Sequence, residues 1–299
     1  MTNILVVVDP EETDHSALNR VKEIPPAADV HYKVDYYIDV QPVLAREAGK
    51  SKMKSHVTER QQWLSALVKP FQEIGYSIET EVQIIDRLYE DIIKSAREFK
   101  ADIVFKPLRQ HGVLKRAFYT STDWNLIRLC PTPILMVSDE PKVHGKPVIA
   151  AVDVGDEDEA HKELNQVVVE QALVLAQVLE SEVHLVYAYG PAVVNSRAAV
   201  ADPLAYQIIR GKYDEEFDLA RVLAKEHGIA EDNVHLREGS PQLVLHEYAK
   251  DIGAGATVIG TIARSGASGL FIGNTAEAVL ERTEIDMFVV KGARFKTPV

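Results

Sequence analysis

The residues best suited to bind a charged ligand lie in one stretch near the C-terminus. Gly260 follows an apolar run, Ala263 comes three residues later, and Gly273 comes after nine further residues, directly before Asn274. Small residues at such points let backbone N–H groups approach an anion closely, and the start of a helix adds unpaired N–H groups. Arg264 adds a positive charge to the same stretch. The pattern therefore indicates a site for phosphate groups.

A carboxylate is expected close to this stretch. Asp153 ends the apolar run 148–152, and loops that follow parallel strands meet at one edge of a sheet, where open α/β sheets bind ligands. A carboxylate there suits a ribose hydroxyl or, through a metal ion, a phosphate. Structural interpretations stay open: Asp153 as a cap of the next loop, the glycines as a tight turn, and Asn274 with Glu277 as an ordinary helix cap.

The elements that must position these residues occur twice along the chain. The runs 4–8 and 148–152 are both apolar, both end in an aspartate (Asp9 and Asp153), and both precede an acidic stretch that opens an amphipathic helix. The later strand-like segments are 32–40, 80–85, 103–105 and 134–137 in the first half, and 182–189, 234–237, 257–259 and 287–290 in the second. Helical segments alternate with them, which predicts parallel sheets covered by helices.

This organisation predicts two α/β domains, residues 1–140 and 145–299, joined within the polar stretch 138–146. Of the 299 residues, 46% are hydrophobic and 26% are charged, which supplies two cores and excludes a disordered chain. The net charge of −12 argues against nucleic acid as a partner, because that binding depends on Lys and Arg. No apolar run reaches the ~20 residues that span a bilayer, and a single cysteine excludes an intramolecular disulfide. We expect a cytoplasmic protein with neither membrane nor nucleic-acid partners.

At the glycine stretch the chain resembles the universal stress protein family. Nucleotide-binding members of that family carry Gly-x2-Gly-x9-Gly-Ser/Thr after their fourth strand; the pattern here is Gly-x2-Ala-x9-Gly-Asn, with Ala263 and Asn274 as the two departures. The resemblance covers essentially the whole chain in two copies, and the runs 273–277 and 122–124 resemble the tandem two-domain E subtype. It implies two flavodoxin-like (adenine nucleotide alpha hydrolase-like) domains, each with five mostly parallel strands, that pair through their last strands as a homodimer would.

The resemblance implies that the second domain binds ATP or a related adenine nucleotide, with or without Mg²⁺. The adenine would lie near Ala188, the ribose would meet Asp153, and the phosphates would meet Gly273. The full set of implied binding residues is Ala151, Val152, Asp153, Ala188, Ile259, Gly260, Ala263, Arg264, Gly273, Asn274 and Thr275. No assembled catalytic set is recognisable, so slow hydrolysis is the most that is expected, and the spacing of His, Cys, Asp and Glu predicts no metal site.

The first half departs further from the family pattern. Its matching positions hold Lys106, Arg109 and Thr120 without phosphate-cradling glycines, although Asp9 is retained. We therefore expect a degenerate copy without ATP, joined to the second domain mainly for structure. Its basic residues either bind another anion or form a solvated face.

Features outside the motif have less specific interpretations. His184 is expected to be a satisfied sheet residue, and Cys130 an inert buried thiol. The segment 191–212 forms either a lid over the pocket and part of a partner surface, or a locally packed connection.

The resulting hypothesis is a stress-induced cytoplasmic regulator that binds an adenine nucleotide in its second domain. The resemblance implies support of survival under stress, including DNA damage, and effects on motility and adhesion, through protein partners that the sequence does not name. Two alternatives remain open: an interaction scaffold that binds no nucleotide, and a slow hydrolase or binder of a larger nucleotide-bearing metabolite. Association of two chains into a homodimer also remains open.

Overall fold

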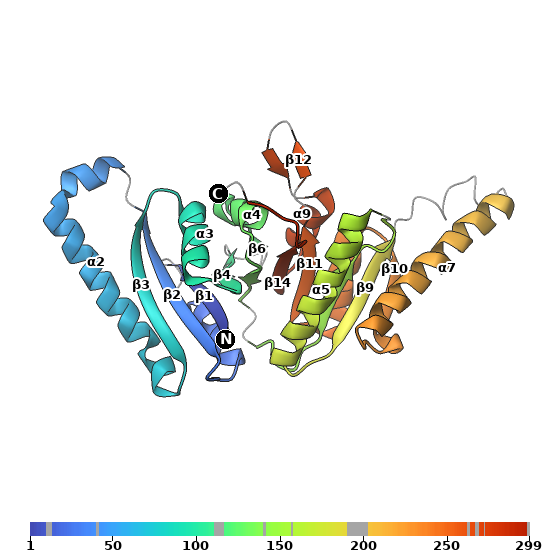
Figure 1. Cartoon of the computed structure of the whole chain (residues 1–299), viewed down its shortest axis with the longest axis horizontal. Coiled ribbons are helices and arrows are strands. Elements are labelled where there is room, and N and C mark those ends of the chain that lie inside the picture. The colour runs from blue at the N-terminus through green and yellow to red at the C-terminus, as the bar shows by residue number, and fades with distance from the viewer. Residues whose placement is uncertain are drawn as a thin grey trace. The chain divides into compact units, whose positions relative to one another are not determined.

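The structure is a computed structural model of the whole chain. It describes residues 1–9, 14–39, 42–110, 117–139, 142–156, 158–189, 203–261, 264–266, 269–271 and 273–297. The chain divides into two compact units (Figure 1). Unit 1 comprises residues 1–109, 119–141 and 296–299, and unit 2 comprises residues 110–118 and 142–295. The two units repeat one order of elements, as the two apolar runs that end in aspartate indicate.

Unit 1 contains five main strands in the order β3-β2-β1-β4-β7, and each of these described pairings is parallel. The strands are β1 (Thr2–Val8), β2 (Val30–Asp39), β3 (Ser77–Ile85), β4 (Ile103–Pro107) and β7 (Ile134–Val137). Between β4 and β7 in the sequence come the two-residue strands β5 (Arg109–Gln110) and β6 (Ala117–Phe118), of which β6 belongs to unit 2. The helices are α1 (Ser16–Arg20), the 3-10 turn η1 (Val21–Glu23), α2 (Pro42–Glu73), α3 (Leu88–Phe99) and α4 (Ser121–Leu129). Strand β1 is continuously apolar from Ile4 to Val8 because side chains on both of its faces are buried there.

Unit 2 repeats this arrangement as β10-β9-β8-β11-β14, again with parallel pairings. The strands are β8 (Val148–Val152), β9 (Val183–Tyr189), β10 (Val234–Glu238), β11 (Ala256–Thr261) and β14 (Asp286–Lys291). The helices are α5 (Glu159–Val178), α7 (Pro203–Glu226), the 3-10 turn η3 (Glu231–Asn233), α8 (Pro241–Ile252) and α9 (Asn274–Leu280). An antiparallel pair, β12 (Arg264–Gly266) with β13 (Gly269–Phe271), lies between the two motif glycines, and the sequence did not predict it.

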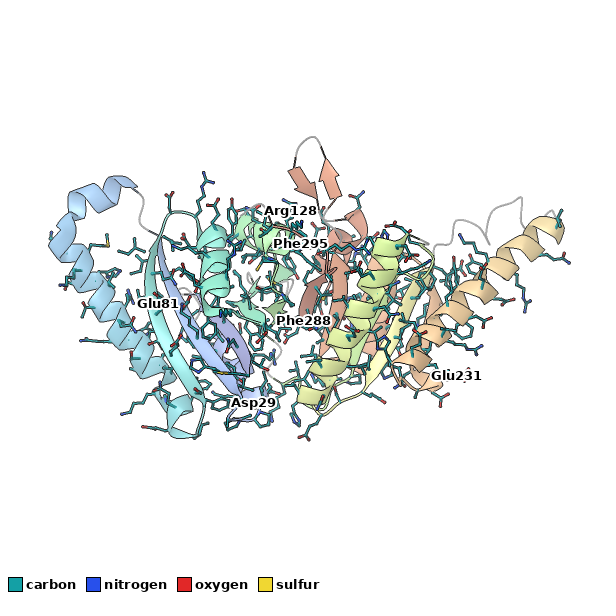
Figure 2. All side chains as sticks on the ribbon, viewed as in Figure 1. Asp29, Glu81, Arg128, Glu231, Phe288 and Phe295 are labelled. Carbon is teal, nitrogen blue, oxygen red and sulfur yellow. The ribbon has the colours of Figure 1, made fainter. Side chains whose placement is uncertain are left out.

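Alternation along the strands decides which helices each side chain of unit 2 meets. A Cβ at Gly260 would point at Leu164 of α5. The strand pairings place Tyr187 level with Gly260 across the sheet, so the Tyr187 side chain also turns toward the α5 side. Ile259 turns to the opposite face, which α8 and α9 cover. Buried aromatic residues such as Phe288 of β14 complete the core (Figure 2).

The predicted fold class is confirmed, since each unit is an α/β arrangement of parallel strands and covering helices. Among the described residues, no helix is both long enough and apolar enough to cross a membrane.

Candidate functional site

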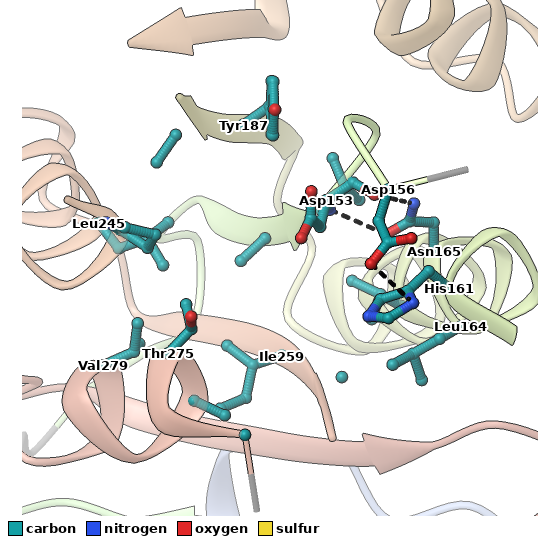
Figure 3. A pocket seen from close by; sticks show the side chains of 18 of the residues that line it. Asp153, Asp156, His161, Leu164, Asn165, Tyr187, Leu245, Ile259, Thr275 and Val279 are labelled. Carbon is teal, nitrogen blue, oxygen red and sulfur yellow. Dashed lines mark hydrogen bonds and ion pairs between the residues drawn. The ribbon is translucent and has the colours of Figure 1, made fainter. Parts of the chain in front are cut away.

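A cavity of about 430 Å³ opens in unit 2 where strands β8, β9 and β11 end (Figure 3). The starts of helices α5, α8 and α9 complete its wall. Its lining consists of Ala151, Val152, Asp153, Asp156, His161, Leu164, Asn165, Val168, Val186, Tyr187, Ala188, Pro241, Leu245, Ile259, Gly260, Gly273, Asn274, Thr275, Ala276 and Val279. The cavity therefore lies at the edge where parallel α/β sheets bind ligands.

Most of the residues that the sequence singled out meet in this cavity. Those that line it are Ala151, Val152, Asp153, Ala188, Ile259, Gly260, Gly273, Asn274 and Thr275. Ala263 lies outside the described residues, and Arg264 is described only as the first residue of β12, without its side chain.

Asp153 is held at both its backbone and its carboxyl group, because the carboxyl accepts a hydrogen bond from the backbone N–H of Gly155. Asn165 of α5 accepts a hydrogen bond from the Asp153 N–H at 2.9 Å and donates one to the Asp153 carbonyl at 2.7 Å. Partial burial raises the pKa of the Asp153 carboxyl; His161 opposes this effect and Asp156 adds to it. The residue lines the wall of the cavity.

A second carboxylate lies beside a histidine at the same end of the cavity. The Nδ1 atom of His161 is 3.1 Å from Asp156 and 3.5 Å from Asp158. This end of the cavity thus offers hydrogen-bond acceptors and one imidazole, which suits hydroxyl groups better than it suits phosphates.

The opposite wall is apolar and comes from elements far apart in sequence. Val186 and Ala188 end β9, Leu245 lies on α8, Ile259 lies on β11 and Val279 lies on α9. A wall of this kind is typical of sites for flat, weakly polar rings.

The two glycines of the motif have different physical roles. A Cβ at Gly260 would lie 2.5 Å from Leu164 Cγ, so this glycine is needed for α5 to pack on β11. A Cβ at Gly273 would meet no atom within 4 Å, and its backbone angles (φ −62°, ψ 142°) suit any residue. Neither packing nor backbone geometry requires a glycine at position 273, so its backbone is open to the cavity.

The start of α9 corrects one expectation. Helix α9 begins at Asn274 and its N-cap is Gly273, without a side-chain cap. The suggested capping pair of Asn274 with Glu277 is therefore wrong, because Asn274 is already inside the helix. The Glu277 N–H donates to the Gly273 carbonyl instead.

The ladder registers also correct the match between the two halves. Val6 pairs with Phe105 in unit 1, and its counterpart Ala150 pairs with Val258 in unit 2. Counting on from these pairs, Pro107 corresponds to Gly260 and Lys106 to Ile259, one residue away from the match made on sequence. Likewise, the N-cap Thr120 of α4 corresponds to the N-cap Gly273 of α9 and not to Asn274.

The Lys106 side chain is therefore not a solvated loop residue. It is buried, and its Nζ lies 2.8 Å from the carboxylate of Asp123, the third residue of α4. Asp123 also accepts hydrogen bonds from the Thr120 N–H and hydroxyl, both at 2.7 Å. The polar groups of unit 1 at this position bond to one another. For Arg109 the side chain is outside the described part of the structure.

The remaining candidates lie outside the cavity. His184 is buried, and its Nδ1 is 2.7 Å from the Tyr248 hydroxyl and 3.2 Å from His235 Nε2. Cys130 is a buried free thiol. Within the described residues, no group of three or more His, Cys, Asp or Glu side chains could hold a metal ion. Of the segment 191–212, residues 191–202 lie outside the described residues and the rest begins α7.

Sequence reasoning missed several lining residues because they act through tertiary placement. Asn165 carried a usable signal, since it is an amide next to Leu164 in an otherwise apolar helical stripe. His161 and Leu245 lie in the first turns of helices that follow strands, and nothing in their local sequence distinguishes them from ordinary helical residues.

Comparison with known proteins identifies the family. A family model described as "Universal stress protein family" matches residues 1–138 and 146–291. Universal stress protein E of Escherichia coli (strain K12) is 32% identical, with 99% of this chain and 96% of the relative covered. The corresponding protein of Salmonella typhi is 33% identical over the same shares. A functionally unknown protein of Pseudomonas aeruginosa PAO1, PA1789, has a crystal structure with a TM-score of 0.78 and 27% identity, covering 98% of this chain and 93% of that one. The chain belongs to the universal stress protein family.

Proposed function

We propose that unit 2 binds an adenine nucleotide, ATP or a close relative, in the cavity at the ends of β8, β9 and β11, and that binding serves regulation. The observation that carries the proposal is that one cavity brings together Gly273, whose backbone is open to a ligand, and the carboxyl of Asp153. Membership of the universal stress protein family supports the same ligand class.

The chemistry of the lining suggests one orientation for this ligand. The adenine ring lies against the apolar wall near Val186, Ala188 and Leu245. The ribose hydroxyls donate to Asp153, which accepts hydrogen bonds when ionised. The phosphates approach Gly273 and the first N–H groups of α9, away from the acidic end of the cavity.

The wider physiology follows from the family resemblance. It implies a cytoplasmic protein that supports survival under stress, including DNA damage, and that affects motility and adhesion. Nucleotide occupancy then biases the conformation that protein partners recognise. Unit 1 acts as the degenerate partner domain.

The test is direct identification of the ligand. The full-length protein is purified without added nucleotide and denatured, and the released small molecules are identified by mass spectrometry. We expect an adenine nucleotide from the wild type and none from the Asp153→Ala, Gly273→Val double variant. Gly292→Val is the matched control, because a Cβ at that glycine also meets open space and the residue lies outside the cavity lining.

A wild-type protein that releases nothing and ignores millimolar ATP in a thermal-shift titration would contradict the proposal. The interaction scaffold would then be the better account. Release of a larger nucleotide-bearing metabolite would favour the enzymatic alternative.

A further inference from the structure

Helix α7 of unit 2 is packed unevenly against its sheet. Towards its C-terminal end Ala220, Leu223 and Ala224 are buried. Towards its N-terminal end a cavity of about 530 Å³ separates it from β10, and Tyr213 and Phe217 line that space. Figure 1 shows α7 diverging from β10 in this direction. An element that is only partly packed has a low local stability, so a single contact can change its order.

Glu216 lies at the boundary between the packed and the open stretch. Its side chain is only 8% exposed, and Lys212 Nζ lies 3.7 Å away on an exposed side chain. The Tyr187 hydroxyl of β9 is hydrogen-bonded to this carboxylate. Burial, Glu216 and Asp153 raise the pKa of Tyr187, so the phenol keeps its proton and remains a donor. A buried carboxylate without such a donor is costly, so this bond favours the seated position of α7.

The same two groups contact the loop that carries Asp153. A Cβ at Gly155 would collide with the Tyr187 hydroxyl and would lie 3.0 Å from Glu216 Oε1. The backbone of Gly155 does not require glycine, because its φ is not positive. The hydroxyl and the carboxylate therefore pack directly on the chain between Asp153 and Asp156, both of which line the nucleotide cavity.

We propose that the Tyr187–Glu216 hydrogen bond couples the nucleotide cavity to helix α7, so that occupancy of the cavity and seating of α7 stabilise each other. The inference rests on the proposed function, and it adds the element through which occupancy is communicated. Glu216 is a positioning residue in this scheme, since it acts on the ligand through the Asp153 loop, whereas Tyr187 also lines the cavity itself. Thermodynamic linkage requires the effect to be reciprocal: ATP orders α7, and loss of the bond weakens ATP binding by the same factor.

Unit 1 has a different arrangement at the equivalent tyrosine. The ladder registers match Tyr36 of β2 with Tyr187 of β9. The Tyr36 ring meets Trp63 of α2 edge-on, with ring centroids 5.4 Å apart. An aromatic pair replaces the hydroxyl–carboxylate bond, so the coupling belongs to unit 2.

Hydrogen–deuterium exchange of the full-length protein with and without ATP tests the coupling. In the wild type, ATP should slow exchange in residues 213–224 by about three- to tenfold. Tyr187→Phe should abolish this protection and weaken ATP binding by about three- to tenfold. Tyr248→Phe is the matched control, because it removes another buried hydroxyl of unit 2 that bonds to His184 instead. Glu216→Gln keeps an acceptor and should retain most of the protection, whereas Glu216→Ala should not.

A ligand-free comparison separates this inference from the proposed function. Without nucleotide, Tyr187→Phe should raise exchange both in residues 153–156 and in residues 213–224, while Tyr248→Phe should leave both segments unchanged. Bound ATP that does not alter exchange in α7, or a Tyr187→Phe protein in which only one of the two segments responds, overturns the coupling. Failure of ATP to bind, with both segments responding in the ligand-free variant, contradicts only the identity of the nucleotide.

Discussion

The two units of this chain place different side chains at the same edge of the same scaffold. By the ladder registers, Val186 and Ala188 of β9 correspond to Asp35 and Tyr37 of β2. In unit 2 the two small apolar residues line the cavity. In unit 1 the two larger residues bond to each other, since the Tyr37 hydroxyl donates to Asp35 at 2.9 Å.

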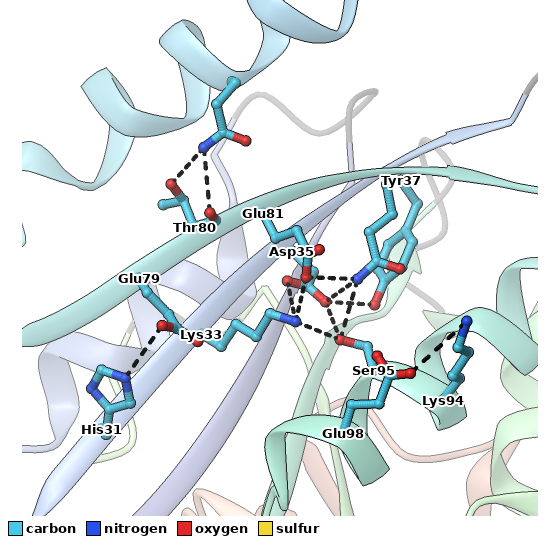
Figure 4. A network of polar contacts seen from close by, with 12 residues as sticks. His31, Lys33, Asp35, Tyr37, Glu79, Thr80, Glu81, Lys94, Ser95 and Glu98 are labelled. Atoms are coloured by element: carbon cyan, nitrogen blue, oxygen red, sulfur yellow. Dashed lines mark hydrogen bonds and ion pairs between the residues drawn. The ribbon is translucent and has the colours of Figure 1, made fainter.

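The unit 1 residues belong to a wider network of polar side chains (Figure 4). The Ser95 hydroxyl of α3 donates to the Asp35 carboxylate, and the Lys33 ammonium lies 3.6 Å from Asp35 and 2.5 Å from Glu81. The buried Lys106–Asp123 pair occupies the positions of unit 1 that correspond to Ile259 and Ala276 in the cavity lining of unit 2.

The difference teaches how a repeated fold can separate binding from structure. Small apolar residues at strand ends leave space and offer no hydrogen-bonding groups, so a ligand can occupy that space and supply the polar contacts. Charged residues at the same ends supply partners to each other, and the site becomes part of the core. The prediction that unit 1 is a degenerate copy is supported by this network more than by its missing glycines.

The largest expected effect comes from breaking the buried pair of unit 1. Asp123→Ala leaves the Lys106 ammonium buried without its carboxylate and removes the Thr120 cap, so the free energy of unfolding should fall by about 3–5 kcal/mol. Urea denaturation measures the loss. The double variant Lys106→Ile, Asp123→Ala copies Ile259 and Ala276 of unit 2 and should recover most of the stability. A loss below about 1 kcal/mol in the single variant would show that the Lys106–Asp123 pair does not stabilise unit 1 as a buried ion pair.

A smaller effect separates the two glycines of unit 2. Gly260→Ala places a methyl group against Leu164 and should cost about 1–3 kcal/mol in urea denaturation, through overpacking. Gly273→Ser adds a good N-cap residue in open space and should change stability by no more than about 0.5 kcal/mol. Equal losses in both variants would remove the distinction between a packing glycine and a ligand-facing glycine.

The third prediction compares the equivalent aspartates. Asp153→Asn should weaken ATP binding by about tenfold in calorimetric titrations, because a charged acceptor of the ribose hydroxyls is lost. The fold should be unaffected, since Asn165 bonds only to the backbone of residue 153. Asp9→Asn in unit 1 is the control and should leave ATP binding unchanged.

Because the pKa of Asp153 is raised, wild-type affinity should start to fall at a higher pH than for an ordinary aspartate as the solution is acidified. ATP affinity that does not change with pH down to pH 4 would count against this role of Asp153.

The smallest effect concerns a second pair of equivalent positions. Lys33 and Glu81 of unit 1 correspond to His184 and His235 of unit 2, whose ring nitrogens are 3.2 Å apart. Burial, with His184 and Arg237, lowers the pKa of His235. Because the pKa of His235 is lower in the folded protein than in the unfolded chain, the unfolded chain binds the proton more tightly. The contribution of His235 to the free energy of unfolding is therefore complete above the usual histidine pKa, near 6.5, and is lost as the pH falls through and below that value. The Tm of His235→Gln should therefore fall less than that of the wild type between pH 7.5 and pH 5; parallel curves would assign the acid sensitivity elsewhere.

The fold was largely predictable because it depends on local patterns that repeat. Each of the two runs 4–8 and 148–152 is apolar and ends in an aspartate, and each is the central strand of its unit. The cavity was predictable at Asp153, Gly260 and Gly273, because parallel strands bring their ends to one edge.

The rest depends on partners that only the tertiary structure brings together. Nothing near Tyr187 in the sequence indicates that its hydroxyl meets Glu216, since the two residues lie on different elements. The match of Lys106 to Gly260 was wrong by one residue, because sequence similarity between the halves is too weak to fix a strand register that backbone pairing fixes. The β12–β13 hairpin was missed because two three-residue strands carry no periodic pattern.

The single cysteine of the chain, Cys130, has a practical consequence. Its thiol is buried in unit 1 and should react slowly with maleimides while the protein is folded. A cysteine introduced at position 273, where a side chain meets open space, would therefore carry a fluorophore selectively. Such a label would report on the polarity of the cavity without removal of the native cysteine, and it would itself fill the space that the phosphates of the proposed nucleotide need.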